Sequence, residues 1–270
     1  MKQREKKAKN IYNQPRYYSD FNEDFMHTKT VKDIVVDEKY QYIPKNPLVR
    51  IFRNLMYYSL GYPGVKLIDR FSYGVKVYGK KNLKKIKGAL LVGNHSNEFD
   101  GCFAIVEVSG PRKCYVIANK DAIEVPVARF FTKAFGALPV ADTNKGLANL
   151  NNSVVKLLQK GNRVAIFPEA HIWPYYTGLR PFSSVGFHYA VKANVPVVPF
   201  AVTYRLRKGK NKMAKKPKVN ITILNPIYPD KNKTLSENKA YLAQEAYEQI
   251  KQALEKANSP KLYDYIKKEN

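Results

Sequence analysis

Short apolar runs alternate with segments of helical periodicity from residue 73 onward. The apolar runs predict strands at Val75–Tyr78, Ala89–Gly93, Cys114–Ala118, Ala137–Val140, Arg163–Phe167, Val195–Tyr204 and Val219–Leu224. The helical pattern predicts helices at Phe99–Val108, Val125–Phe135, from Asp142 or Thr143 to Gly161, at Phe182–Lys192, and after a capping box of Thr234 and Glu237. This alternation predicts an α/β fold with a mostly parallel central sheet flanked by helices.

Residues 46–72 have the pattern of amphipathic helices. Arg50 and Arg53 lie opposite an apolar helical face, and a glycine- and proline-containing break follows at Gly61–Gly64. The apolar residues are Leu48, Ile51, Phe52, Leu55 and Met56 before the break, and Val65, Leu67, Ile68 and Phe71 after it. We predict an N-terminal amphipathic helical hairpin that associates with a membrane interface. The alternative is an ordinary helical hairpin packed on the core.

The first part of the chain, residues 1–45, is polar, basic and rich in tyrosine, without sustained periodicity. We expect an arm that is partly ordered at most. The predicted organisation is therefore a basic arm (1–45), a helical membrane-association segment (46–72) and an α/β domain (73–270). Within that domain, the lysine-rich stretch Arg205–Lys218 predicts an exposed basic loop.

Charge and cysteine content limit the setting in which the protein works. The formal charge is +25, from 47 Lys and Arg residues against 22 Asp and Glu residues, so nucleic acid or an anionic membrane surface is the expected partner. Cys102 and Cys114 are the two cysteines, which favours a reducing, cytosolic setting without disulfides. The basic start has no apolar segment behind it, and no apolar run reaches roughly 18 residues. We therefore expect neither a signal peptide nor a spanning helix.

The first candidate site follows the predicted strand Ala89–Gly93, where the sequence continues Asn94-His95 and reaches Asp100 five positions after the histidine. Open α/β sheets hold their sites at the carboxyl ends of strands. A histidine beside a carboxylate is suited to general-base catalysis. In an unbroken helix, residues five apart diverge by roughly 140°, so contact between these side chains requires an irregular turn. The alternative is a histidine bonded to a carbonyl, with Asp100 capping the next helix.

The second candidate site is Phe167-Pro168-Glu169, which also follows an apolar strand. A proline cannot donate to the sheet, so we expect the strand to end there and Glu169 to turn outward. Further along, Val195–Pro199 contains two prolines, which predict a bulge, an edge or a strand start.

Together these segments resemble the glycerolipid acyltransferases that carry an H-x4-D motif, typified by 1-acylglycerol-3-phosphate acyltransferase. The resemblance extends over residues 73–227. Asn94-His95 through Asp100 matches the first block of that family, and Gly136 through Val140 is similar to the second. Phe167-Pro168-Glu169 matches the third block, and Val195 through Pro199 matches the V-P-x-x-P pattern of the fourth.

The resemblance implies a mechanism in which His95 takes the proton of an acceptor hydroxyl while that hydroxyl attacks an acyl thioester. Asp100 would orient His95, and Glu169 would help to shape the acceptor site. The donor would be acyl-CoA or acyl-carrier protein and the acceptor a lysophospholipid. The transfer would be direct, without an acyl-enzyme, a metal or a cofactor. For Glu169, the alternative is a carboxylate held in an ion pair, with Arg180 as the candidate partner.

Two positions depart from the family pattern. The second and third blocks of the family usually carry arginines that contact the acceptor's phosphate, but Asp142 and Ile172 stand here. Arg180 is the best substitute for the lost cation, because its planar fork suits phosphate. His171 and Lys120 are further candidates for contacts with the acceptor.

Three functions are compatible with these observations. The favoured one is an acyltransferase of phospholipid biosynthesis, bound peripherally or monotopically at the cytoplasmic face of the membrane, with membrane lipids as partners. A basic nucleic-acid-binding protein is the first alternative. We do not expect nucleic acid as a partner, because the sequence contains no glycine-rich phosphate loop or helix-turn-helix pattern. A lipid-binding scaffold without catalysis is the second alternative, left open by the altered third block.

Overall fold

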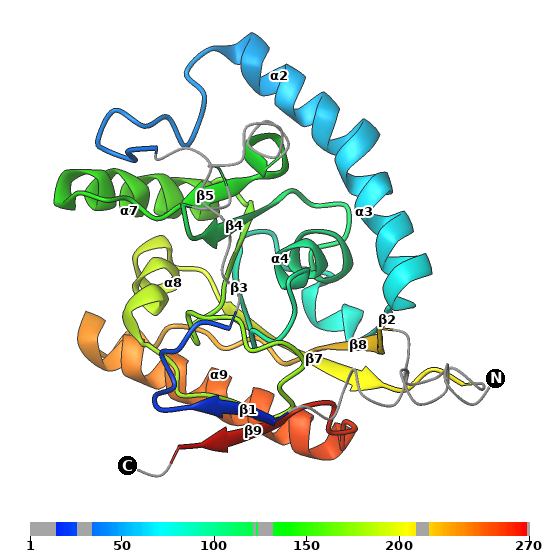
Figure 1. Ribbon diagram of the computed structural model, residues 1–270. Coiled ribbons are helices and arrows are strands. Elements are labelled where there is room, and N and C mark those ends of the chain that lie inside the picture. Colours follow the sequence, from blue (N-terminus) through cyan, green and yellow to red (C-terminus); the bar gives the residue numbers. More distant parts are fainter. Residues whose placement is uncertain (1–14, 26–33, 121–122, 124–131, 209–215, 269–270) are drawn as a thin grey trace.

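The computed structural model describes residues 15–25, 34–120, 123, 132–208 and 216–268. Within this part of the chain, seven strands form one sheet with helices on both faces (Figure 1). The strands, in order across the sheet, are β2 (Lys76–Tyr78), β8 (Lys218–Ile223), β7 (Val197–Arg205), β3 (Ala89–Gly93), β6 (Arg163–Ile166), β4 (Cys114–Ala118) and β5 (Ala137–Pro139). Neighbouring strands are parallel, except that β7 and β8 pair antiparallel. The predicted mostly parallel α/β sheet is confirmed.

Within the described residues, helices cover both faces of the sheet. They are α4 (Asp100–Phe103), which continues in a π-helical turn over Ala104–Val108, α7 (Asn144–Gln159), α8 (His188–Ala193) and α9 (Leu235–Ala257). The predicted capping box is present at the start of α9, where Thr234 and Glu237 satisfy each other's backbone N–H groups. The predicted helix at 125–135 lies largely outside the described residues, as does the middle of the predicted basic loop at 205–218.

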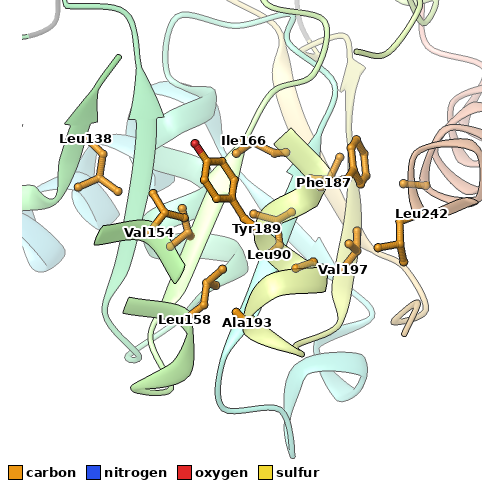
Figure 2. Packing of buried hydrophobic residues seen from close by; sticks show 14 of the residues in the cluster. Leu90, Leu138, Val154, Leu158, Ile166, Phe187, Tyr189, Ala193, Val197 and Leu242 are labelled. Atoms are coloured by element: carbon orange, nitrogen blue, oxygen red, sulfur yellow. The ribbon is translucent and has the colours of Figure 1, made fainter. Parts of the chain in front are cut away.

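The core lies on both faces of the sheet, because successive side chains of a strand point to opposite sides. Leu90 and Val92 of β3 pack in a cluster with residues of α7, α8 and α9, part of which Figure 2 shows. Leu91, between them, packs in a second cluster with Phe103 of α4. The central strand is therefore apolar along its whole length, as expected of a strand covered on both faces.

Of the two prolines of the fourth block, one directly precedes β7 and the other lies in β7, just before the residue at which β7 begins to pair with β8. Pro196 precedes the strand, which begins at Val197 rather than at Val195. Pro199 lies within β7, opposite Val92 of β3, and the antiparallel pairing with β8 begins one residue later. Pro199 has no N–H to donate, but its carbonyl accepts a hydrogen bond from Leu224 at 2.8 Å.

The predicted N-terminal hairpin was wrong in one respect, since the described chain makes no turn at Gly61–Gly64. Helix α2 (Pro47–Met56), a π-helical turn, helix α3 (Tyr62–Ile68) and a second π-helical turn run in continuous succession along one side of the molecule (Figure 1). Gly61 has helical torsions, and a Cβ atom there would lie 2.3 Å from the ring of Phe135. The glycine therefore allows close packing of this helix rather than a reversal of the chain.

A second, two-stranded sheet joins the two ends of the described chain. Strand β1 (Pro15–Tyr18) pairs in parallel with β9 (Asp264–Lys267), as Figure 1 shows. The sequence pattern did not predict either strand. Part of the predicted arm thus takes a defined position, while the proposed domain boundaries stay a prediction.

Candidate active site

His95 and Asp100 lie together at the carboxyl end of β3, in the turn that leads into α4. Nδ1 of His95 is 3.2 Å from Oδ2 of Asp100. The same carboxylate oxygen accepts hydrogen bonds from the backbone N–H groups of Ser96 at 2.8 Å and Asn97 at 2.7 Å. The turn between the two side chains is irregular, because helix α4 begins only at Asp100. This is the geometry that contact across five residues requires.

The Asp100 contact fixes the orientation of the imidazole of His95. Asp100 is fully buried, while 16% of the His95 side chain is exposed. With Nδ1–H donating to the carboxylate, Nε2 is the nitrogen left to accept a proton. The ring of Phe167 stacks on the imidazole with centroids 4.4 Å apart and an angle of 17° between the planes. The imidazole is therefore held between a carboxylate and an aromatic ring, with Nε2 left outside the Asp100 contact.

The backbone of the His95 turn is tied to strand β7. Oδ1 of Asn94 accepts a hydrogen bond from the N–H of Val202 at 2.7 Å, and Nδ2 of Asn94 donates to the Val202 carbonyl at 3.0 Å. The Asn94 amide thus continues the pairing of β3 with β7 beyond the strand's end. The hydroxyl of Tyr204 donates to the carbonyl of Ser96 at 2.9 Å and lies 2.8 Å from its hydroxyl. These contacts hold the turn on both sides of His95.

Glu169 contacts the same turn from the loop that follows strand β6. Its Oε1 accepts a hydrogen bond from the backbone N–H of His95 at 3.0 Å, and its Oε2 accepts one from Nε of Arg180 at 2.8 Å. Both side chains are almost completely buried, with 2% of Glu169 and 1% of Arg180 exposed. The ion-pair alternative for Glu169 is therefore present, and the pair also fixes the backbone of His95.

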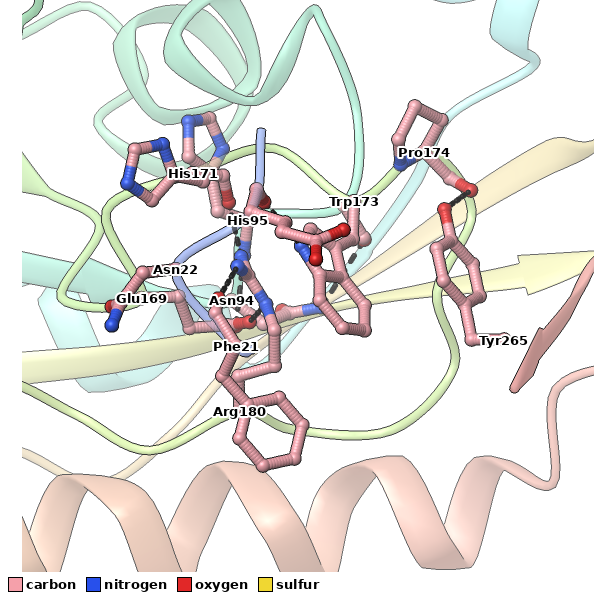
Figure 3. Close-up of polar contacts among 12 residues, drawn as sticks. Phe21, Asn22, Asn94, His95, Glu169, His171, Trp173, Pro174, Arg180 and Tyr265 are labelled. Atoms are coloured by element: carbon pink, nitrogen blue, oxygen red, sulfur yellow. Dashed lines mark hydrogen bonds and ion pairs between the residues drawn. The ribbon is translucent and has the colours of Figure 1, made fainter. Parts of the chain in front are cut away.

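All three guanidinium nitrogens of Arg180 make hydrogen bonds within the protein. Besides Glu169, they bind the carbonyl of Phe21 at 3.2 Å and the carbonyl of His171 (Figure 3). The guanidinium also lies over the ring of Trp173, 4.9 Å from its centroid. In this position Arg180 does not reach an open site, so the geometry disagrees with the predicted contact to an acceptor anion.

The other two predicted substrate contacts lie in different places. His171 belongs to the loop that carries Glu169. Its side chain is about one-third exposed, with Nδ1 3.7 Å from Oδ2 of Asp24. Lys120 follows β4, and its Nζ lies 3.3 Å from Oδ1 of Asp142. The other oxygen of Asp142 accepts a hydrogen bond from the N–H of Val36 at 2.9 Å. The carboxylate that replaces the family's arginine thus holds Lys120 and the arm.

Burial changes the acidity of the groups around His95. Complete burial raises the pKa of Asp100, while the His95 ring and the two backbone N–H groups act in the opposite direction. Burial likewise raises the pKa of Glu169, opposed by the charge of Arg180 and the N–H of His95. Burial raises the pKa of the Cys102 thiol to about 12, so this cysteine near the motif is not a thiolate nucleophile.

The loop after β6 contributes contacts that the sequence motifs did not indicate. The backbone N–H of Trp173 donates to the carbonyl of His95 at 3.2 Å, and that of Tyr175 donates to the carbonyl of Ser96 at 2.7 Å. Nε1 of Trp173 donates to the carbonyl of Glu23 at 2.8 Å. Trp173 is the one tryptophan of the chain and lies just after the third block, which is the signal that could have identified it.

The described residues contain no group of three or more His, Cys, Asp or Glu side chains arranged to hold a metal ion. Over the same residues, no helix combines the length and the hydropathy needed to cross a bilayer.

A histidine oriented by a buried aspartate, at the carboxyl ends of the strands of an open α/β sheet, is an arrangement suited to general-base catalysis. Residues 74–203 match the model of the family described as Acyltransferase. An uncharacterized acyltransferase of Schizosaccharomyces pombe is 30% identical over 196 residues, which are 64% of this chain and 67% of that protein. The chain therefore belongs to the acyltransferase family, and the prediction that it is an acyltransferase is confirmed.

Other relatives have more specific names. A 1-acyl-sn-glycerol-3-phosphate acyltransferase of Bacillus subtilis is 28% identical over 169 residues, covering 61% of this chain and 79% of that protein. The crystal structure of the 1-acyl-sn-glycerophosphate acyltransferase PlsC from Thermotoga maritima superimposes with a TM-score of 0.57 at 18% sequence identity. It covers 82% of this chain and 87% of that one. This last similarity shows a shared fold.

Proposed function

We propose that this protein transfers a fatty acyl group from a thioester donor to the hydroxyl of a lysophospholipid-like acceptor, such as 1-acylglycerol-3-phosphate, in phospholipid biosynthesis. The observation that carries the proposal is the contact of His95 Nδ1 with the buried Asp100, which leaves Nε2 as the nitrogen that can act as the base on a partly exposed side chain. The names of several relatives support the acceptor class.

The proposed reaction is a direct transfer. Nε2 of His95 takes the proton of the acceptor hydroxyl as its oxygen attacks the thioester carbonyl, and Asp100 stabilises the imidazolium that forms. A C–O bond forms, the C–S bond breaks, and the imidazolium returns its proton to the departing thiolate. No acyl-enzyme, metal or cofactor takes part in this scheme. Glu169 and Arg180 act indirectly, by fixing the backbone from which His95 projects.

The proposed donor is acyl-CoA or acyl-carrier protein. Both are acidic, and the formal charge of +25 supports attraction of either one. His171 stays the predicted polar contact to the acceptor, since it lies on the loop of Glu169 and is partly exposed. Lys120 stays a weaker prediction of the same kind, because it is already paired with Asp142.

The proposal includes peripheral association with the cytoplasmic face of the membrane. The helical segment from α2 to the π-helical turn after α3 exposes large apolar side chains, which supports burial of this surface in a lipid interface. We call this surface the apolar face; it consists of Leu48, Ile51, Phe52, Leu55, Tyr58, Leu60, Leu67 and Phe71.

The identity of the lipid made by the purified protein tests the proposed function. Labelled acyl-CoA and acyl-carrier protein are each offered with a panel of lysolipids in vesicles, and the products are identified by mass spectrometry. We expect one added acyl chain on a lysophospholipid hydroxyl. The absence of any acylated lipid with either donor, from folded and vesicle-bound protein, contradicts the proposal.

A further inference from the structure

A small cavity lies between α2 and the amino ends of β4 and β5. Its volume is about 80 Å³, and its charged lining residues are Arg50, Arg53, Lys113 and Lys133. We call these four residues the basic cradle. No carboxylate is among the lining residues. Arg50, Arg53 and Lys113 form no ion pair within the described part of the chain.

Lys113 is fixed in position inside the cradle. Its Nζ donates to Oδ1 of Asn54 at 2.5 Å and lies 5.3 Å and 5.4 Å from the ring centroids of Tyr57 and Tyr115. Burial, together with the nearby charge of Arg53, lowers the pKa of Lys113 to about 8. Like charges held around one cavity repel one another, and an anion placed among them removes that cost.

The cradle is separate from the proposed catalytic site. Lys113 directly precedes β4, and the cavity also contacts Gly136, Ala137 and Leu138 at the start of β5. His95 follows the carboxyl end of β3, and the strands between them are parallel. The two sites therefore lie at opposite ends of the parallel strands. A five-residue strand separates these ends by about 15 Å. A ligand in the cradle is not the molecule being acylated.

The size and position of the cradle indicate its ligand. A cavity of about 80 Å³ is far below the roughly 300 Å³ at which sites for whole small molecules begin, so it suits a single phosphate group rather than a nucleotide. Arg50 and Arg53 lie on the side of α2 opposite the exposed Leu48, Ile51 and Leu55. A helix whose apolar side enters the lipid interface holds cations on its other side at the depth of the headgroups.

We infer that the basic cradle binds the phosphate of an anionic membrane phospholipid, as a docking subsite distinct from the catalytic site. The inference rests on the proposed membrane association and adds to it a preference for anionic lipid. Arginine and lysine together supply a bidentate fork and a point charge for the phosphate oxygens. A bound phosphate would fix α2, and with it the whole helical segment, against the edge of the sheet.

Vesicle sedimentation with the full chain tests the inference. Binding is measured to phosphatidylcholine vesicles with and without phosphatidylglycerol, for the wild type and for the double variant Arg53→Gln/Lys113→Gln. The matched control is Lys251→Gln/Lys256→Gln, which removes the same charge from exposed positions on α9, on the other side of the molecule from α2 (Figure 1). We expect the cradle variant to lose about tenfold or more of the affinity gained from phosphatidylglycerol, since each basic residue near an anionic surface contributes roughly fivefold. The control should lose little. An equal loss in both variants overturns the inference.

Two further arms separate the possible failures. The variant Leu48→Ser/Ile51→Ser/Leu55→Ser should weaken binding to both kinds of vesicle. If it does not, the proposed membrane association fails, whatever the cradle variant does. Inorganic phosphate should displace the protein from phosphatidylglycerol vesicles no better than chloride at equal ionic strength. Selective displacement by phosphate shows a site for the free anion and overturns the commitment to a lipid.

The pH dependence gives a readout that a structural role would not change. Lys113 is faced by Arg53 from α2, by Tyr57 from the turn after α2, and by Tyr115 from β4. Burial raises the pKa of both tyrosines, that of Tyr115 to about 12, so they stay neutral as Lys113 titrates. We expect the gain from phosphatidylglycerol to fall as pH rises through about 8 in the wild type, and less so in Lys113→Gln. An identical pH profile in the two proteins contradicts a phosphate contact by Lys113.

Discussion

At the scale of single residues, the site depends on a few carboxylate oxygens, and the clearest case accepts hydrogen bonds from several donors. Oδ2 of Asp100 accepts from the His95 ring and two backbone N–H groups, and so fixes the turn and the imidazole together. The sequence predicted the His95–Asp100 pair from its place after a strand. It offered the ion pair of Glu169 and Arg180 only as an alternative. It could not predict the contact of Arg180 with Phe21, because these two residues lie far apart in the chain.

Arg180 is the residue for which sequence and structure give different expectations. We expect Arg180→Lys to lower the free energy of unfolding by about 1–3 kcal/mol, because a lysine cannot reproduce the hydrogen bonds of the guanidinium to the Glu169 carboxylate and to two backbone carbonyls. We also expect kcat to fall with little change in the acceptor KM, since the loss acts through Glu169 and the backbone of His95. Thermal unfolding and steady-state kinetics check both effects.

A change in KM rather than in kcat and stability of Arg180→Lys would support a contact between Arg180 and the acceptor's anion. A raised KM for phosphate-bearing acceptors, with unchanged kcat and unchanged thermal stability, would mean that the guanidinium touches the acceptor. A neutral acceptor measured in parallel separates the two cases, because a positioning residue affects both acceptors alike.

At the scale of elements, the sequence predicted the central strands and the main helices well, because their apolar periods are regular. The prediction failed where glycine and proline residues are compatible with either a chain reversal or a continuous helix. Gly61 and Pro63 indicated a break, but Gly61 packs against Phe135, and Pro63 lies near the start of α3 directly after a π-helical turn. A shift in the hydrogen-bond ladder before a proline lets a helix continue. Only the tertiary contacts decide between these outcomes.

The π-helical turn that ends this helical segment contains a buried carboxylate. Asp69 is completely buried, and neither of its carboxylate oxygens has a hydrogen-bond partner among the described residues. Burial, with the nearby charge of Glu107, raises the pKa of Asp69 to about 8, against the effect of Lys66. The folded state therefore holds a proton that the unfolded chain releases near pH 4.

This proton predicts a pH-dependent stability. Between about pH 4 and pH 8 the unfolded state binds fewer protons at Asp69, so its contribution to stability falls by up to roughly 1.4 kcal/mol per pH unit and levels off above. We expect Asp69→Asn to flatten this dependence and to raise Tm at pH 8 by roughly 2–4 °C per kcal/mol recovered. Thermal unfolding from about pH 5 to pH 8 measures it. Asp264→Asn, at a half-exposed position, is the matched control, and an equal response of both variants would show that Asp69 is not the group responsible.

At the scale of the whole molecule, the two ends of the described chain meet beside the loop that supports His95. The ring of Tyr265 in β9 stacks on Trp173, with centroids 4.9 Å apart, and its hydroxyl donates to the carbonyl of Pro174 at 2.8 Å. Arg16 of β1 lies 4.2 Å from the ring centroid of Tyr263. Pairing between segments some 250 residues apart leaves no local pattern in a sequence, which is why these strands were not predicted.

The net charge of the molecule, by contrast, could be counted from the sequence, but the positions of the charges in the fold could not be predicted. The composition indicated an anionic partner. The fold adds that four of the cations surround one small cavity on the side of α2 opposite its apolar face. A partner surface that is both apolar and anionic agrees with a phospholipid membrane better than with nucleic acid.

The central claim is that His95 is the base in acyl transfer, and one comparison tests it most directly. Transfer from labelled acyl-CoA to the lysolipid acceptor is measured for the wild type, His95→Ala and His188→Ala. His188 is a matched histidine, because its ring binds the carbonyl of Val185 and does not contact the site. We expect His95→Ala to lose at least roughly 100-fold in rate with unchanged folding and vesicle binding, and His188→Ala to stay within about twofold. Undiminished transfer by a folded His95→Ala protein would contradict the account.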